Sequence, residues 1–512
     1  MSNSSVSSMV ERTLVLFLFT CFPFLQSVAD DGIALRNCRM ASPHHQAIAK
    51  RAAADRMPGG DFYHGERRQL VVLAAFSDKA FRGDEASTLT QWDKIFNQEH
   101  LTEAPFKGSV HDYFYDQSYG QLQLTFDLQY VTLSKPEKQY ASTATDDENS
   151  KYLVSDIVDQ LLTRDIDWSQ YDWNGDGYVN QLLIIFAGKG MNAGGGSSTI
   201  WPHQWWLSEH DNFQARTFQY GGKQYTVDSY CCVQELYSDN GYGTFGTICH
   251  EYSHCFGLPD FYNGSTSYVR HWDLMDYGNN NGGGFLPCGY SAHERMVMGW
   301  LTPTELTDAT TVSDMPALAD EPQAYLVRND GYPSEYYIIE NRQQTGWDEL
   351  LPASGIVVFH IDYDPQLWCS ITEMVNTAGK RRYTIFPANN RTSYSYESGW
   401  AYPNGTNNLL TNTSAPSATL LHDNVDGQKL MSKPITDMAV SDGQASFLFM
   451  DGQTAIRQAS MDNGQWSMNG QWTMDNGQCY DLHGRRLAMP FDELPKGIYI
   501  VRQNGTTRTV KR

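Results

Sequence analysis

The segment His250-Glu251-Tyr252-Ser253-His254 contains the residue types of a catalytic metal site. Positions i and i+4 of an α-helix lie on one face, so both imidazoles can reach the same ion. Glu251 lies beside them and can accept a proton from a water that the metal activates. We therefore predict that His250 and His254 bind zinc and that Glu251 is the general base.

Three carboxylates that follow this motif are candidates for a third ligand. Asp260 comes directly after Gly257-Leu258-Pro259, and a sharp turn at the glycine would bring its carboxylate back toward the metal. Two histidines and one carboxylate leave the fourth position of zinc open for water, as in catalytic sites. We predict Asp260 as the ligand. The alternatives are an Asx-type turn at this position, or Asp273 or Glu294 as the ligand.

A second cation site is predicted in the segment DWNGDGYVN at 172–180. Its polar residues and its glycine at position six follow the spacing of an EF-hand calcium loop. Position twelve is Leu183 rather than a bidentate glutamate, so the full loop is absent. A hairpin rich in Asn and Asp is the alternative. The predicted calcium ligands are Asp172, Asn174, Asp176, Tyr178 and Asn180.

The elements that must position these residues are visible in the apolar pattern. We predict a helix over 243–257, ended by Gly257, because five apolar residues form a stripe away from the histidines: Phe245, Ile248, Cys249, Tyr252 and Phe256. A strand–helix–strand core is predicted over 68–188. Its strands are 69–76, 121–131 and 181–188, and its helix is 151–163, with Leu153, Ile157, Leu161 and Leu162 on one face.

Composition limits the class of protein. The chain has 512 residues, 41% of them hydrophobic and 19% charged, with a formal net charge of -22. These values favour a folded chain of several domains and disfavour a nucleic-acid partner, which would require a basic surface. His203 lies among aromatic residues and is expected to be packed and hydrogen-bonded. Cysteines cluster between 231 and 288. This pattern is compatible with disulfides and equally with buried free thiols.

The termini differ in character from the centre of the chain. An apolar run after Arg12 ends before Ser27-Val28-Ala29, which predicts a signal peptide over 1–29 and a secreted or surface protein. We expect a pro-segment over 30–65, a domain over 66–305 that carries the metal motif, and a β-rich domain over 306–450 with strands at 336–343 and 355–364. A repeat linker follows over 451–478, then a small β segment over 479–512. The predicted fold class is α+β.

Several segments resemble the M6 family of metallopeptidases, the immune inhibitor A-like enzymes. They are HEYSHCFGLPDFY, WDLMDYG, GYSAHERMVMGWL and YDWNGDGYVNQLLIIFAG, and the resemblance covers roughly 66–450. It implies a metzincin-like, secreted zinc endopeptidase, often with calcium. It also implies that Met275 forms a methionine turn beneath the metal. Tyr277, two residues later, could donate a hydrogen bond to the oxyanion. Read alone, this segment would predict only a packed methionine and a core tyrosine.

The last 34 residues resemble the C-terminal sorting segments of exported Bacteroidetes proteins. This resemblance implies an export machinery as a partner, and a β-hairpin cap is the alternative. Cys38 in the pro-segment could cap the zinc as a thiolate.

The sequence therefore predicts a monomeric, zinc-dependent endopeptidase that hydrolyses protein or peptide substrates with a zinc-activated water. The alternatives are a surface adhesin or binding protein on a zincin scaffold, and a metal-dependent esterase or amidase of small substrates.

Overall fold

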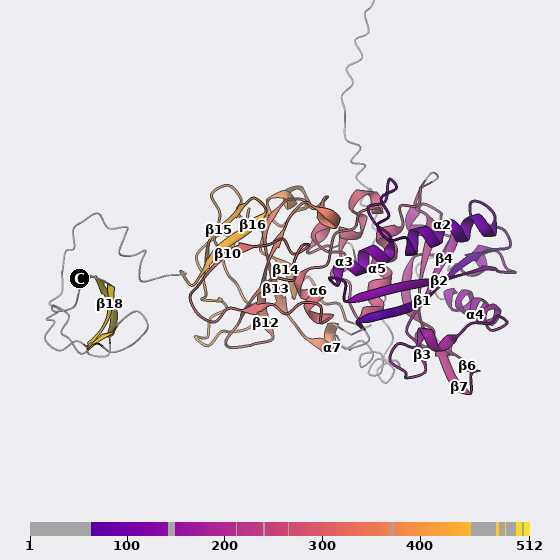
Figure 1. Ribbon diagram of the computed structural model, residues 1–512, viewed down its shortest axis with the longest axis horizontal. Helices are drawn as coiled ribbons and strands as arrows, with labels where there is room; N and C mark the ends of the chain where they lie inside the picture. Colours follow the sequence, from indigo (N-terminus) through magenta and orange to yellow (C-terminus); the bar gives the residue numbers. More distant parts are fainter. Residues whose placement is uncertain are drawn as a thin grey trace, which may run out of the picture.

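The computed structural model describes most of residues 63–451 and parts of the C-terminal segment (Figure 1). Inside the first range, residues 142–148, 211, 239–240, 265, 369 and 371–372 are not described. Beyond it, only residue 487 and the backbones of 478–480, 498–503 and 506–511 are described. The predicted signal peptide, the pro-segment up to residue 62, Cys38 and the linker between 452 and 477 lie outside the described residues.

The first half of the chain is built on a five-stranded sheet in the order β2-β1-β4-β8-β5. Four strands are parallel, and β5 alone runs antiparallel to its neighbour β8. The predicted strands of this region are confirmed. The strands are β1 (Gly65–Ala75), β2 (Leu122–Thr132), β4 (Leu182–Lys189), β5 (His203–Trp206) and β8 (Ser229–Leu236).

Helices cover both faces of this sheet, which is why β1 reads as a continuous apolar run. Val71 and Leu73 face a core shared with α2 (Glu85–Asn97), α3 (Val110–Gln117) and α5 (Phe245–Ser253). Leu70 and Val72 face the opposite core, which contains α4 (Ser150–Leu161). Alternate residues of one strand therefore stabilise two separate layers.

Helix α4 differs from its prediction at one residue. Leu153, Ile157 and Leu161 are buried as expected, but Leu162 is 39% exposed. The helix ends at Leu161, so Leu162 follows the last turn and lies off the i, i+4 row of the other three residues.

A short sheet has the strand order β3-β7-β6. Its strands come between β2 and β8 in the sequence. It contains β3 (Tyr178–Val179), β6 (Arg216–Tyr220) and β7 (Lys223–Val227). Residues with 3₁₀ geometry occur at Glu137–Gln139, Trp168–Tyr171, Met191–Ala193, Leu207–Glu209, His254–Phe256, Arg270–Trp272, Gly346–Asp348 and Tyr394–Gly399, and at Tyr277–Gly284, where a kink at Asn281, Gly282 and Gly283 interrupts the helical geometry.

The second half is rich in strands. One sheet has the order β14-β13-β12-β11-β9 and another the order β10-β16-β15. The first contains β9 (Thr304–Glu305), β11 (Tyr325–Arg328), β12 (Glu335–Arg342), β13 (Gly355–Asp362) and β14 (Tyr383–Ile385). The second contains β10 (Thr310–Met315), β15 (Ile435–Ser441) and β16 (Gln444–Phe449). Two short helices, α6 (Ala292–Val297) and α7 (Pro365–Trp368), accompany them.

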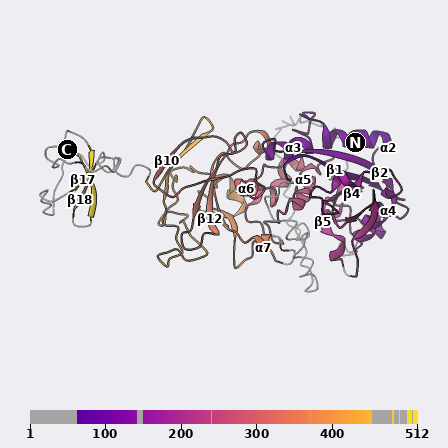
Figure 2. The same ribbon diagram turned by 60° about the horizontal axis from the view of Figure 1, so that its bottom comes forward.

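The two halves meet near α5 and α6 in both views (Figures 1 and 2). Ile338 and Phe359, on one face of β12 and β13, belong to the same hydrophobic cluster as β1 and α5. Ile339 and Val358, on the other face, pack with β10, β15 and β16. The predicted boundary at 305/306 therefore does not separate two hydrophobic cores.

The chain is thus a mixed α/β protein with several sheets and few helices. The C-terminal segment contributes three antiparallel strands, β17 (Gln478–Tyr480), β18 (Ile498–Gln503) and β19 (Thr506–Lys511). Among the helices that the structure describes, none has the length and apolar character needed to cross a membrane.

Candidate metal centre

Helix α5 carries the predicted motif, and its apolar stripe explains its position. Phe245, Ile248, Cys249, Tyr252 and Phe256 are all buried in the core shared with β1. The α-helix ends at Ser253, and His254–Phe256 continue as one 3₁₀ turn. Gly257 then adopts a left-handed conformation with φ of 83°, which a residue without a Cβ adopts at little cost. The chain reverses at this glycine, as predicted.

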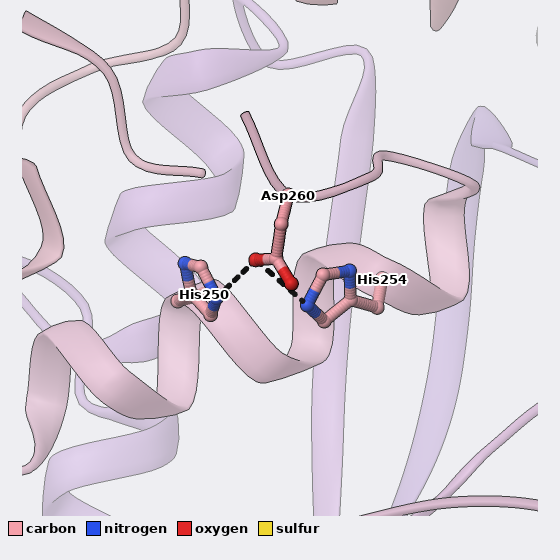
Figure 3. A group of neighbouring side chains, drawn as sticks. All are labelled: His250, His254 and Asp260. Atoms are coloured by element: carbon pink, nitrogen blue, oxygen red, sulfur yellow. Dashed lines mark ion pairs between the residues drawn. The ribbon is translucent and has the colours of Figure 1, made fainter. Parts of the chain in front are cut away.

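The reversal brings Asp260 back to the two histidines (Figure 3). Oδ1 of Asp260 lies 3.1 Å from Nε2 of His250 and 3.6 Å from Nε2 of His254. One donor atom from each residue lies within 4.8 Å of the others. The three residues are buried, with exposed fractions of 3%, 8% and 3% in chain order. In the described part of the chain this is the only cluster of three such side chains able to hold a metal.

Two backbone carbonyls fix the orientation of the histidine rings. Nδ1 of His250 donates to the carbonyl oxygen of Leu274 at 2.9 Å, and Nδ1 of His254 donates to that of Leu258 at 2.7 Å. Each Nε2 is therefore directed toward Asp260. A carbonyl partner on the second ring nitrogen is the usual support of a metal-binding histidine.

The electrostatics of this cluster favour a cation. Burial alone would lower the pKa of His250, but the hydrogen bond and the charge of Asp260 raise it more strongly, to about 9. Positive charge is thus stabilised between the histidine and the aspartate. Nitrogen and carboxylate donors together suit zinc, so the residues present fit the predicted metal.

The alternative third ligands point elsewhere. Asp273 accepts hydrogen bonds from the backbone N–H of Met275 and the hydroxyl of Tyr383, each at 2.8 Å. Glu294 forms the capping box of α6 with Ser291. Both carboxyl groups are buried, and burial raises the pKa of each; that of Asp273 is about 7. Neither side chain belongs to the cluster of His250, His254 and Asp260.

The predicted base and turn methionine lie next to the cluster. Glu251 is buried, and its Oε2 lies 3.9 Å from Nε2 of His254. Met275 is fully buried, and its carbonyl accepts from the N–H of Phe261 at 2.9 Å. The residue before it, Leu274, supports His250. The turn at Met275 therefore contacts both His250 and the segment that carries Asp260.

Two tyrosines border this region. Tyr277 begins the 3₁₀ segment Tyr277–Gly284, and its ring lies 6.1 Å from that of His271. Tyr262 was missed by sequence reasoning: its ring is nearly parallel to that of His250, with centroids 6.3 Å apart. The signal that could have indicated Tyr262 in the sequence is its position two residues after Asp260.

The loop at 172–180 forms hydrogen bonds within itself. Oδ2 of Asp172 accepts from Gly177 N at 3.0 Å, and Oδ1 of Asp176 accepts from Tyr178 N at 2.8 Å. Oδ1 of Asn180 accepts from Trp173 N at 2.6 Å, and Oδ1 of Asn174 accepts from Asp176 N at 3.4 Å. These are the turn contacts of the hairpin alternative. Calcium binding here stays a prediction.

Two other predictions concerned residues near the sheet. His203 is buried and hydrogen-bonded, with Nδ1 2.7 Å from the carbonyl of Trp201 and Nε2 3.0 Å from the hydroxyl of Tyr230. The described cysteines of the 231–288 cluster, Cys231, Cys232, Cys249, Cys255 and Cys288, are thiols rather than disulfides.

Comparisons with known proteins agree on the M6 metallopeptidases. Residues 63–298 match the family profile described as "Immune inhibitor A peptidase M6, catalytic domain". Immune inhibitor A of Bacillus thuringiensis subsp. alesti is 29% identical over 283 residues, which cover 46% of this chain and 40% of that protein. The pre-pro-metalloprotease PrtV of Vibrio cholerae is 25% identical over 244 residues, covering 42% and 24%. The chain thus spans less than half the length of these curated relatives.

Proposed function

Residues 63–298 match the catalytic-domain profile of the M6 peptidase family, and from this premise we propose that the protein is a secreted zinc-dependent endopeptidase. The observation that carries the proposal is the convergence of His250, His254 and Asp260 beside Glu251. Two imidazole nitrogens and a carboxylate would hold the metal and leave one position open. When bound, zinc would lower the pKa of a water to about 7 and polarise the substrate carbonyl.

Glu251 performs the proton transfers in this proposal. Its carboxylate takes a proton from the attacking water as the new C–O bond forms at the peptide carbonyl. It then delivers that proton to the leaving nitrogen as the C–N bond breaks. Burial of Glu251 beside His254 keeps bulk water from competing for the proton. Tyr277 is the proposed hydrogen-bond donor to the oxyanion.

Further parts of the proposal rest on sequence alone. The signal peptide over 1–29 and the sorting role of 479–512 imply export, and 172–180 is the proposed calcium site. Neither the signal peptide nor the linker lies in the described residues.

A casein zymogram with and without a chelator tests the proposed activity. We expect clearing of casein by the full chain, loss of clearing with the chelator, and recovery on addition of zinc. An intact protein that binds zinc but never cleaves casein or peptides would favour the adhesin alternative. Cleavage of small esters alone would favour the esterase alternative.

A further inference from the structure

The metal ligands depend on a short turn at 273–275. The carbonyl of Leu274 accepts from His250, and the carbonyl of Met275 accepts from the N–H of Phe261, the residue after Asp260. A hydrogen bond within the turn stabilises it: Oδ1 of Asp273 accepts from Met275 N at 2.8 Å. A shift of this turn would therefore move both His250 and Asp260.

Tyr383 of β14 contacts this turn from the second half of the chain. Its hydroxyl donates to Oδ2 of Asp273 at 2.8 Å and lies 2.7 Å from Oγ of Ser291. Its ring stacks on Phe261, with centroids 3.8 Å apart and an interplanar angle of 18°. Tyr383 is fully buried, so a single side chain contacts both the turn and the neighbour of Asp260.

Asn376 closes the arrangement. Its Nδ2 donates to the carbonyl of Phe261 at 2.9 Å and to that of Tyr383 at 2.8 Å. Its Oδ1 accepts from Tyr383 N at 2.9 Å. The side chain is fully buried. Phe261, the turn, Tyr383 and Asn376 thus form a closed ring of contacts, in which every member contacts at least two others.

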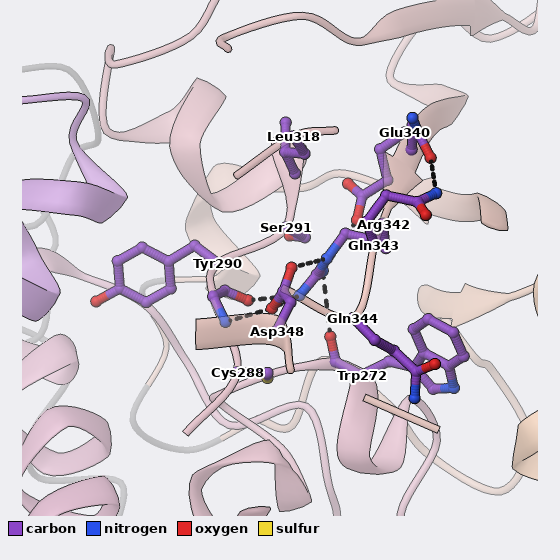
Figure 4. Close-up of polar contacts among 12 residues, drawn as sticks. Trp272, Cys288, Tyr290, Ser291, Leu318, Glu340, Arg342, Gln343, Gln344 and Asp348 are labelled. Carbon is purple, nitrogen blue, oxygen red and sulfur yellow. Dashed lines mark hydrogen bonds and ion pairs between the residues drawn. The ribbon is translucent and has the colours of Figure 1, made fainter. Parts of the chain in front are cut away.

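Arg342 of β12 supports the same loop one residue earlier (Figure 4). Its guanidinium donates to the carbonyls of Trp272 at 3.4 Å and Gly289 at 3.0 Å. Ion pairs with Glu340 and Asp348 hold it in place. The backbone leading into the 273–275 turn is therefore tied to β12, while the turn itself is tied to β14.

We propose that Tyr383 and Asn376 are positioning residues of the zinc site. They touch neither metal nor substrate. They hold Phe261 and the 273–275 turn against each other, so that Asp260 and His250 converge at the distance a metal requires. This inference deepens the proposed function and rests on zinc binding by His250, His254 and Asp260. It places part of the metal centre beyond residue 298, where the family match ends.

Tyr383→Phe in the full chain tests the proposal, because it removes one hydroxyl and keeps the ring that stacks on Phe261. We expect zinc affinity, measured by competition with a chromogenic chelator, to fall about 10- to 100-fold, as for lost outer-shell partners of other metal sites. At saturating zinc, kcat should fall with little change in KM. The visible absorption bands of the cobalt-substituted protein should also shift.

Tyr337→Phe is the matched control. Tyr337 is a buried tyrosine of β12 whose hydroxyl donates to the carbonyl of Thr419 at 2.7 Å. It loses the same atom and one hydrogen bond, so its melting temperature should fall while zinc affinity and cobalt bands stay as in the wild type. Asn376→Ser, which removes the donor to Phe261, should weaken zinc binding in the same direction and carries the test if Tyr383→Phe does not fold.

Wild-type zinc affinity in a folded Tyr383→Phe variant would overturn the inference, and so would equal losses in Tyr383→Phe and Tyr337→Phe. If Asn376→Ser has to stand in, wild-type affinity there has the same meaning. A wild-type chain that binds no zinc would instead overturn the proposed function itself, which keeps the two failures distinct.

Discussion

The two predicted cation sites of this chain, the metal centre and the 172–180 loop, differ in what holds their donor atoms. In the 172–180 loop, one carboxylate oxygen of Asp172, one of Asp176 and the amide oxygen of Asn180 accept from backbone N–H groups of the loop itself. At the metal centre, His250 is supported by the carbonyl of Leu274 from a separate segment, His254 by the nearby carbonyl of Leu258, and Asp260 reaches both histidines across a chain reversal. A local pattern can satisfy its own hydrogen bonds, whereas convergent buried ligands require support from the rest of the fold.

This comparison predicts a large dependence of activity on the metal centre and a small dependence on the loop. The largest effect is expected for Glu251→Gln. The variant should fold and bind zinc like the wild type but lose at least about 100-fold in kcat, because only the proton acceptor is removed. Metal analysis and peptide turnover measure the two quantities.

Glu349→Gln is the control for that variant, since the side chain of Glu349 forms an exposed ion pair with Lys107, and it should keep wild-type activity. Activity of Glu251→Gln within tenfold of the wild type would contradict the assigned base.

The next effect concerns the third ligand. Asp260→Ala should lose most zinc under mild chelation, because one of three protein ligands is gone. Glu294→Ala should keep its zinc and lose only stability, since Glu294 completes the capping box of α6 with Ser291. Zinc content after dialysis against a weak chelator separates the two. The reverse order of zinc loss would move the ligand from Asp260 to Glu294.

A smaller effect is expected at the 172–180 loop. If it binds calcium, the ion should raise the melting temperature, because a ligand of the folded state alone adds about 2.7 kcal/mol at one hundred times its Kd. Asp176→Ala should remove this response. Asp165→Ala, an exposed acid outside the loop, should keep it. Thermal unfolding with calcium and with a calcium chelator makes the measurement, and an unchanged melting temperature would leave the hairpin alone.

The smallest effect on the enzyme is expected from a change outside both predicted cation sites. Deleting 479–512 should leave peptidase activity and melting temperature nearly unchanged, because a terminal segment behind a polar linker adds little stability to the body. In a native host that reads the segment as a sorting signal, the shortened protein should accumulate inside the outer membrane. Cell fractionation decides this: normal surface or medium levels would contradict the sorting role, and a large stability loss would indicate a structural cap.

The local parts of the metal centre were predictable from the sequence. The spacing of His250 and His254 is a property of any helix, and Gly257 signals the reversal because its conformation favours glycine. The strands of the first sheet were equally visible, because strands buried on both faces are continuously apolar. Each of these signals operates within a few residues along the chain.

The sequence favoured Asp260 as the third ligand and left Asp273 and Glu294 as alternatives. Only the tertiary structure decided what occupies those two carboxylates: Asp273 accepts from Met275 and Tyr383, and Glu294 accepts from Ser291. The contribution of Asn376 and Tyr383 was likewise invisible. They lie more than 100 positions after Asp260, and no local periodicity encodes a contact of that sequence separation. Such contacts exist only once β12–β14 and α5 bury their apolar faces in one core.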